Sequence, residues 1–271
     1  YGKILDASAR LITMKEDPES FTTFVKQALP PSAPVSRFTG MLLEQAQNEM
    51  QDQQLRIAEL LYKATTEVAE EGSPQHQSAS FYLLILDDNA EKMREVFGQL
   101  SQNLPTQALI KLFRPVPELQ LERFTRNDPK TGGDKFFNSF AKFGEHFNAP
   151  QLMEDTQFRA FMANEFEALA QNDQFIADLA AITPPAPGHK QHEVYVSLRL
   201  RKLALIMDPS DPTRWSTFFA PALANIKLNH ELSFLYDDID LAKMPAGAII
   251  ENNDLMMTRL NDMLNQGLDI V

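Results

Sequence analysis

Cysteine is absent from this chain of 271 residues, which excludes disulfides, thiolate metal sites and a cysteine nucleophile. Glycine is sparse, at ten residues, and neither of the phosphate-binding patterns G-x-G-x-x-G and G-x-x-x-x-G-K-[ST] occurs. The G-x-S-x-G nucleophile elbow is also missing. No apolar run approaches the roughly 18 residues of a membrane span, since the longest candidate is FYLLIL at 81–86. We therefore expect no membrane insertion.

Basic residues are outnumbered, because 25 Lys and Arg accompany 37 Asp and Glu and give a net charge of −12. Affinity for nucleic acid comes largely from cations that neutralise phosphates, and anionic membranes attract basic segments in the same way. The acidic balance thus argues against nucleic acid as a partner. A hydrophobic content of 44% and a charged content of 23% are typical of a soluble globular protein.

Helical periodicity is the main pattern in what remains. Between residues 38 and 71 the apolar residues return to one face of a helix, and Gly72 and Pro74 then supply a stop signal. The members of this face are Leu43, Ala46, Met50, Ile57, Leu61, Ala64 and Val68. We predict one long amphipathic helix over about 38–71, with its apolar stripe interrupted near residues 53–54.

A second helical segment is rich in phenylalanine. Phe136, Phe140, Phe143 and Phe147 are spaced by four, three and four residues, so their rings share one helical face. We predict that Asp134 caps this helix and that Pro150 starts the next one, which repeats the apolar spacing with Phe158, Met162, Phe166 and Leu169. A ligand pocket is one reading of such a stripe, but core packing is favoured because each buried ring is worth about 2–3 kcal/mol.

Prolines mark the expected boundaries at 29–34, 112–120 and 182–191. Residues 192–207 fit both strand and helix periods; we favour a helix for the second half and allow one small β-hairpin near 182–200. The predicted fold is all-α, an irregular multi-helix bundle. It forms two packed sub-bundles, 1–120 and 121–271, or one continuous domain.

Histidine and aspartate clusters are the remaining candidates for chemistry. His189 and His192 make an H-x-x-H pair, but no third ligand is visible apart from Glu193, so we interpret both as surface histidines. Neither of the two His-Glu pairs continues into H-E-x-x-H, which excludes that class of zinc protease. The sequence therefore predicts no metal and no cofactor.

Asp237, Asp238 and Asp240 crowd into four positions of the sequence. Their spacing is one residue short of the DDxxD motif of class I terpenoid synthases, and we do not assign the chain to that family. On a helix over residues 226–239 these aspartates point in different directions and cannot converge on one ion. We expect instead that the helix ends near Tyr236 and that one aspartate caps the following turn.

With no catalytic residue in evidence, we expect a soluble helical protein–protein interaction module: a scaffold, an adaptor or an effector domain acting on a partner protein. The alternatives are a regulator of a small GTPase-type switch and an enzyme whose site leaves no linear motif, although a non-enzymatic role is favoured. The expected contacts lie in the proline-rich loop and on rings beside the apolar stripe of residues 226–239: Ile182, Pro184, Pro185, Pro187, His189, Phe234 and Tyr236.

The expected location is the cytoplasm, or a host cytoplasm if the protein is a secreted effector. Tyr1 in place of methionine and the apolar ending MLNQGLDIV suggest that the native chain continues at one end or both. The identity of the partner and the oligomeric state stay open.

Overall fold

The structure is a computed structural model that describes residues 18–28, 35–52, 54–87, 89–185, 192–224, 235 and 239–248. Within these ranges every regular element is a helix and no strand occurs, which confirms the predicted all-α, multi-helix fold. None of the described helices is both long and apolar enough to cross a bilayer. The chain divides into two compact units, Tyr1–Pro105 and Thr106–Val271.

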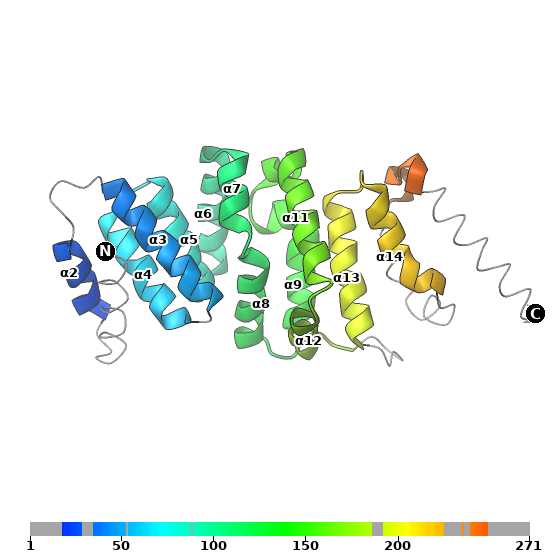
Figure 1. Cartoon of the computed structure of the whole chain (residues 1–271), viewed down its shortest axis with the longest axis horizontal. Helices are drawn as coiled ribbons and strands as arrows, with labels where there is room; N and C mark the ends of the chain where they lie inside the picture. The colour runs from blue at the N-terminus through cyan, green and yellow to red at the C-terminus, as the bar shows by residue number, and fades with distance from the viewer. Residues whose placement is uncertain are drawn as a thin grey trace, which may run out of the picture. The chain divides into compact units, whose positions relative to one another are not determined.

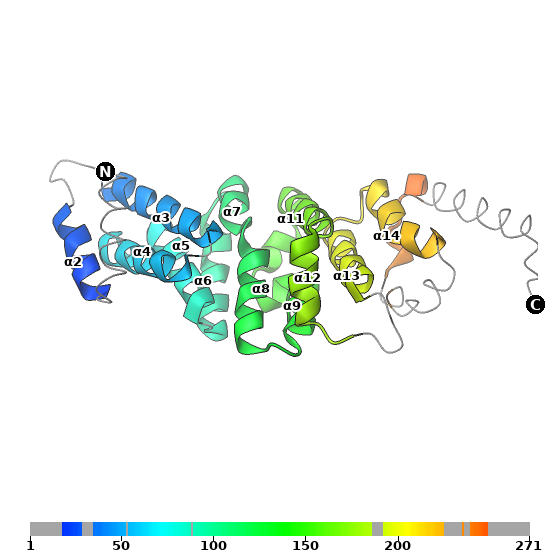
Figure 2. The same ribbon diagram turned by 60° about the horizontal axis from the view of Figure 1, so that its bottom comes forward.

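Unit 1 is built from helices that pack against helices one or two positions away in the chain. Its described helices are α2 (Pro18–Ala28), α3 (Val35–Gln51), α4 (Leu55–Val68), α5 (Pro74–Asp87) and α6 (Ala90–Asn103). Helix α4 packs against α2, α3 and α5, and α5 packs against α6. Both views show α3, α4 and α5 side by side (Figure 1, Figure 2).

The prediction of one continuous helix over 38–71 is wrong. The chain leaves the helix after Gln51 and re-enters it at Leu55, and α3 and α4 pack against each other. The break falls where the apolar stripe is interrupted, because folding back lets the two half-stripes bury each other. Tyr62 of α4 donates a hydrogen bond to the sulfur of Met50 of α3 at 3.3 Å, which joins the two halves.

Unit 2 contains the remaining described elements. These are α7 (Thr106–Phe113), α8 (Val116–Asn127), α9 (Gly132–Ala141), α10 (Phe143–His146), η1 (Pro150–Met153), α11 (Thr156–Leu169), α12 (Asp173–Ala181), α13 (His192–Met207), α14 (Pro212–Ala224) and η3 (Leu241–Lys243). Helix α13 contacts α9, α11, α12 and α14. It therefore organises this unit, with α11 and α14 on either side of it (Figure 1).

The phenylalanine stripe forms part of the core of unit 2, as predicted. Phe136, Phe140, Phe143 and Phe147 are each 0–1% exposed. Phe140 meets Phe166 of α11 edge to face, with ring centroids 5.0 Å apart. Such aromatic contacts add about 0.5–1.5 kcal/mol each to the free energy of burial.

Two details of the phenylalanine-rich segment differ from the prediction. Helix α9 begins at Gly132 rather than after Asp134, and it stops at Ala141 before the short α10. Pro150 opens the 3-10 helix η1 instead of the next α-helix. The next α-helix, α11, is capped by Asp155, which accepts a hydrogen bond from the backbone N–H of Phe158 at 2.9 Å.

Proline-rich stretches do separate helices as expected, at 29–34, at 114–115 and after α12. The β-hairpin allowed near 182–200 is not formed over its described part, because residues 192–207 are helical throughout. Apolar residues surround α13 on several sides, where α9, α11, α12 and α14 cover it. Burial on several faces explains why its sequence lacked a clear helical stripe.

Candidate partner-binding site

The base of the proline-rich segment 182–191 is held by the N-terminus of α9. The backbone N–H of Gly133 donates a hydrogen bond to the carbonyl of Ile182 at 2.8 Å. A Cβ atom at position 133 would lie 1.9 Å from Oγ1 and 2.8 Å from Cα of Thr183. Only glycine fits so close an approach of two backbones.

His192, the first residue of α13, also holds the base of the segment. Nε2 of His192 lies 3.0 Å from the carbonyl oxygen of Ala180 and 3.0 Å from that of Thr183. The Thr183 hydroxyl in turn donates to the carbonyl of Leu179 at 2.6 Å. The last carbonyls of α12, which lack partners within the helix, are thus satisfied where the segment begins.

The Arg199 side chain connects the start of α9 to α13 beside the base of the segment. Arg199 of α13 pairs with Asp134 of α9 and lies over the ring of Phe137, with its guanidinium carbon 3.9 Å from the ring centroid. Nη1 of Arg199 also donates to the hydroxyl of Tyr195 at 3.1 Å. The Arg199 side chain is 14% exposed and that of Asp134 is 45% exposed, so the cation is shielded while its carboxylate partner stays open to solvent.

The predicted contact residues fall into three groups. Pro185 is exposed and Pro184 is partly exposed, as a binding segment requires. Ile182 is 3% exposed, so its side chain packs in the core and offers little surface to a partner. Four of the seven lie outside the described residues: Pro187, His189, Phe234 and Tyr236.

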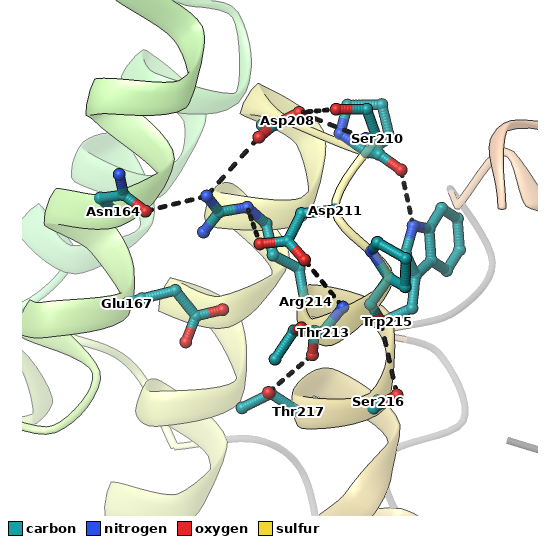
Figure 3. A network of polar contacts seen from close by, with 12 residues as sticks. Asn164, Glu167, Asp208, Ser210, Asp211, Thr213, Arg214, Trp215, Ser216 and Thr217 are labelled. Atoms are coloured by element: carbon teal, nitrogen blue, oxygen red, sulfur yellow. Dashed lines mark hydrogen bonds and ion pairs between the residues drawn. The ribbon is translucent and has the colours of Figure 1, made fainter. Parts of the chain in front are cut away.

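A second polar cluster joins α11, α13 and α14 (Figure 3). Its centre is Arg214, whose side chain is 6% exposed. Nη2 of Arg214 donates to Oδ1 of Asn164 at 2.9 Å and lies 3.5 Å from a carboxylate oxygen of Asp208. Nε lies 3.8 Å from a carboxylate oxygen of Asp211. The cluster therefore ties the start of α14 to α11.

Glu167 of α11 points toward the same cluster (Figure 3). Burial raises the pKa of its carboxyl, and the nearby cations Arg201 and Arg214 only partly oppose that effect. Nη1 of Arg201 lies 3.9 Å from Oε2 of Glu167. These charges come from three helices, which is typical of a buried network that fixes helix positions.

The turn before α14 is also tightly hydrogen-bonded. Asp208 accepts from the backbone N–H and the hydroxyl of Ser210 at 3.2 and 2.6 Å, and Asp211 accepts from the N–H of Thr213 at 2.9 Å. Trp215 donates its indole N–H to the carbonyl of Pro209 at 2.8 Å. All of these contacts lie within the turn or the first turn of α14. They stabilise the local fold, and we assign this polar cluster a structural role only.

Glu118 of unit 2 has a carboxyl whose pKa is raised. The surrounding protein raises the pKa of Glu118 to about 7, and repulsion from Glu165 and Glu122 adds to this against the opposing effect of Arg114. The Glu118 side chain is nevertheless exposed. Screening by solvent weakens such pKa shifts at a surface. We therefore assign Glu118 no catalytic role.

Metal binding finds no support in the described part of the chain. No three His, Asp or Glu side chains there gather closely enough to hold an ion. His192, one half of the H-x-x-H pair, is engaged with backbone carbonyls. Asp240 caps η3 by accepting from the N–H of Ala242 at 3.1 Å, which confirms that one aspartate caps the turn after the acidic cluster. Asp237 and Asp238 lie outside the described residues.

Sequence reasoning missed the residues that build the base of the segment. The pair Gly132–Gly133 before a helix was a usable signal, because adjacent glycines often mark a close backbone approach. The roles of His192 and Arg199 carried no linear signal, since their partners lie 9–12 and 65 positions away.

No model of a known protein family, no curated protein and no solved structure shows a significant match to this chain.

Proposed function

We propose that this chain is a helical protein–protein interaction module, a scaffold, adaptor or effector domain, that offers its proline-rich segment 182–191 to a partner protein. One observation carries the proposal. Gly133 of α9 and His192 of α13 form hydrogen bonds that fix the base of the segment. The segment follows as Thr-Pro-Pro-Ala-Pro. Ile182 and Thr183 at its base are buried, whereas Pro185 is exposed, which is consistent with a contact surface beyond the base.

The chemistry of the segment indicates the kind of partner. Consecutive prolines restrict the backbone to an extended conformation, so they lose little entropy on docking. Proteins commonly recognise such segments in grooves lined by aromatic side chains. We propose a partner of that kind, met in the cytoplasm of the cell or of a host. A regulator of a GTPase-type switch is one form of such a module, whereas an enzyme is the alternative.

The test compares two proline stretches of the same chain. In one variant Pro184, Pro185 and Pro187 become alanine; in the matched control Pro30, Pro31 and Pro34 become alanine. Partners captured from a lysate of the native host are identified by mass spectrometry, purified and titrated against each variant by calorimetry. A synthetic peptide of residues 181–192 serves as competitor.

We expect the first variant to lose at least about tenfold in affinity, or about 1.4 kcal/mol, and the control to bind as wild type does. The peptide should compete for the same partner. Unchanged affinity of the first variant would move the interface away from the segment and remove the basis of the proposal.

A further inference from the structure

Helix α14 contains a proline in its interior. Pro221 lies within Pro212–Ala224 and has no backbone N–H, so the carbonyl of Thr217, four residues earlier, cannot receive the usual helical hydrogen bond. The Thr217 hydroxyl also donates to the carbonyl of Thr213 at 2.7 Å, a type of contact that often bends helices. The hydrogen-bond ladder of α14 is therefore interrupted before its last turn.

Helix α13 supplies a donor to this carbonyl. Nη1 of Arg201 donates to the backbone carbonyl oxygen of Thr217 at 3.5 Å, in a partly buried contact. The Arg201 side chain is 18% exposed, so it is held between helices rather than extended into solvent. A carbonyl that is shielded from water and left without a partner is costly. Arg201 thus replaces the donor that Pro221 lacks.

The same nitrogen of Arg201 faces a carboxylate. Nη1 lies 3.9 Å from Oε2 of Glu167 on α11, and Oε1 of Glu167 is buried with no hydrogen-bond partner among the described residues. Both distances from Nη1 exceed the ~3 Å of an ordinary N–H···O hydrogen bond, so Arg201 is fully engaged by neither acceptor. A guanidinium favours an ionised carboxylate over a neutral carbonyl. The charge of Glu167 therefore weakens the hold of Arg201 on α14.

We propose that α14 has a hinge at Pro221 and that Arg201 is its latch, with the charge of Glu167 setting how firmly the latch closes. While Arg201 bonds the Thr217 carbonyl, the last turn of α14 continues the helix. When this bond is lost, the last turn opens and the rest of unit 2 stays folded. The hinge is independent of the proline-rich segment, so it stands whether or not that segment binds a partner.

Native-state amide hydrogen exchange of the intact chain measures such an opening residue by residue. The amides of residues 222–224 report on the last turn, and those of residues 216–219 report on the turns before Pro221. The variants are Arg201→Met, Pro221→Ala and their combination. An alanine at position 221 has an N–H that can bond the Thr217 carbonyl, so Pro221→Ala is the matched background in which the latch has no task.

We expect Arg201→Met to speed exchange at residues 222–224 about fivefold relative to residues 216–219, the factor that corresponds to one net hydrogen bond. In the Pro221→Ala background the same substitution should leave this ratio unchanged. The loss of the cation beside Glu167 is common to both backgrounds and cancels in the comparison.

Glu167→Gln tests the second part of the proposal, because it keeps the shape of the side chain and removes its charge. It should slow exchange at residues 222–224 in the chain with Pro221 and have no effect on these residues in the Pro221→Ala background. This pair of proteins keeps the test decisive even if Arg201→Met does not fold.

Equal acceleration by Arg201→Met in both backgrounds would overturn the latch, because Arg201 would then act elsewhere than on the Thr217 carbonyl. So would faster exchange throughout α14 with a matching loss in urea unfolding, since Arg201 would then be a general stability residue. Exchange that is unchanged or faster in Glu167→Gln would refute the control by Glu167. None of these substitutions alters residues 182–191, so the proposed function is decided separately by the proline variants.

Discussion

The close backbone approach at Gly133 makes Gly133→Ala an informative substitution. The added Cβ would lie 1.9 Å from Oγ1, 2.7 Å from Cβ and 2.8 Å from Cα of Thr183. Rotation of the Thr183 side chain can relieve the first contact only, because its Cβ and Cα belong to a backbone held by Gly133 and by α12. Overpacking of this kind costs about 1–3 kcal/mol, more than the ~1 kcal/mol that alanine gains over glycine inside a helix.

The assay is urea unfolding followed by tryptophan fluorescence. Trp215 is the one tryptophan of the chain and is 1% exposed in unit 2, so its emission reports on the unit that carries the substitution. We expect a net fall in the free energy of unfolding of up to about 2 kcal/mol, which is the cost of overpacking less the gain from alanine. The matched control is Gly40→Ala in α3, where an added Cβ meets nothing within 4 Å; by circular dichroism it should be neutral or stabilised by up to about 1 kcal/mol.

A double variant shows whether the clash between the added Cβ at position 133 and Thr183 causes the loss of stability. Thr183→Ala removes Oγ1 but leaves Cβ and Cα in place, so the combination with Gly133→Ala should recover part of the loss. The double variant should therefore be more stable than the sum of the two single effects by more than 0.5 kcal/mol, roughly the limit of additivity for independent sites. Strict additivity, or a Gly133→Ala variant as stable as the wild type, would refute the reasoning.

Two further predictions concern charges of unit 2. Arg214→Met should lower the free energy of unfolding by about 3–5 kcal/mol, because Asp208, Asp211 and Glu167 lose a buried cation; a loss below 1 kcal/mol in urea unfolding would contradict this. A hydrogen bond from Lys135, at 2.6 Å, and contacts with Thr131 lower the pKa of Asp128 to about 2. Since an unfolded aspartate titrates near ~3.9, this stabilisation is present above about pH 4 and is lost as the pH falls to 2. Asp128→Asn should flatten that part of the stability profile, and an unchanged slope would show that the Lys135 contact contributes nothing.

Particular elements show how far the sequence alone could reach. The phenylalanine spacing over 136–147 predicts core packing correctly, because helical periodicity is local and apolar rings are buried wherever the fold permits. Proline positions predict helix boundaries for the same local reason. The interruption of the apolar stripe near residues 53–54 is visible in the sequence. The sequence alone could not show whether the two halves of the stripe pack against each other or against a third element.

The proline-rich segment illustrates the same division. Composition alone singles out prolines 184, 185 and 187 as a stiff stretch. Sequence could not place Ile182 in the core, assign the His192 imidazole to the carbonyls of Ala180 and Thr183, or explain why Gly133 must be glycine. Local pattern thus indicated that the described part of this chain is helical and where some of its helices end, but not the break between α3 and α4. Tertiary structure decided which backbones meet, because such contacts join residues 9 to 65 positions apart through distances that no linear spacing encodes.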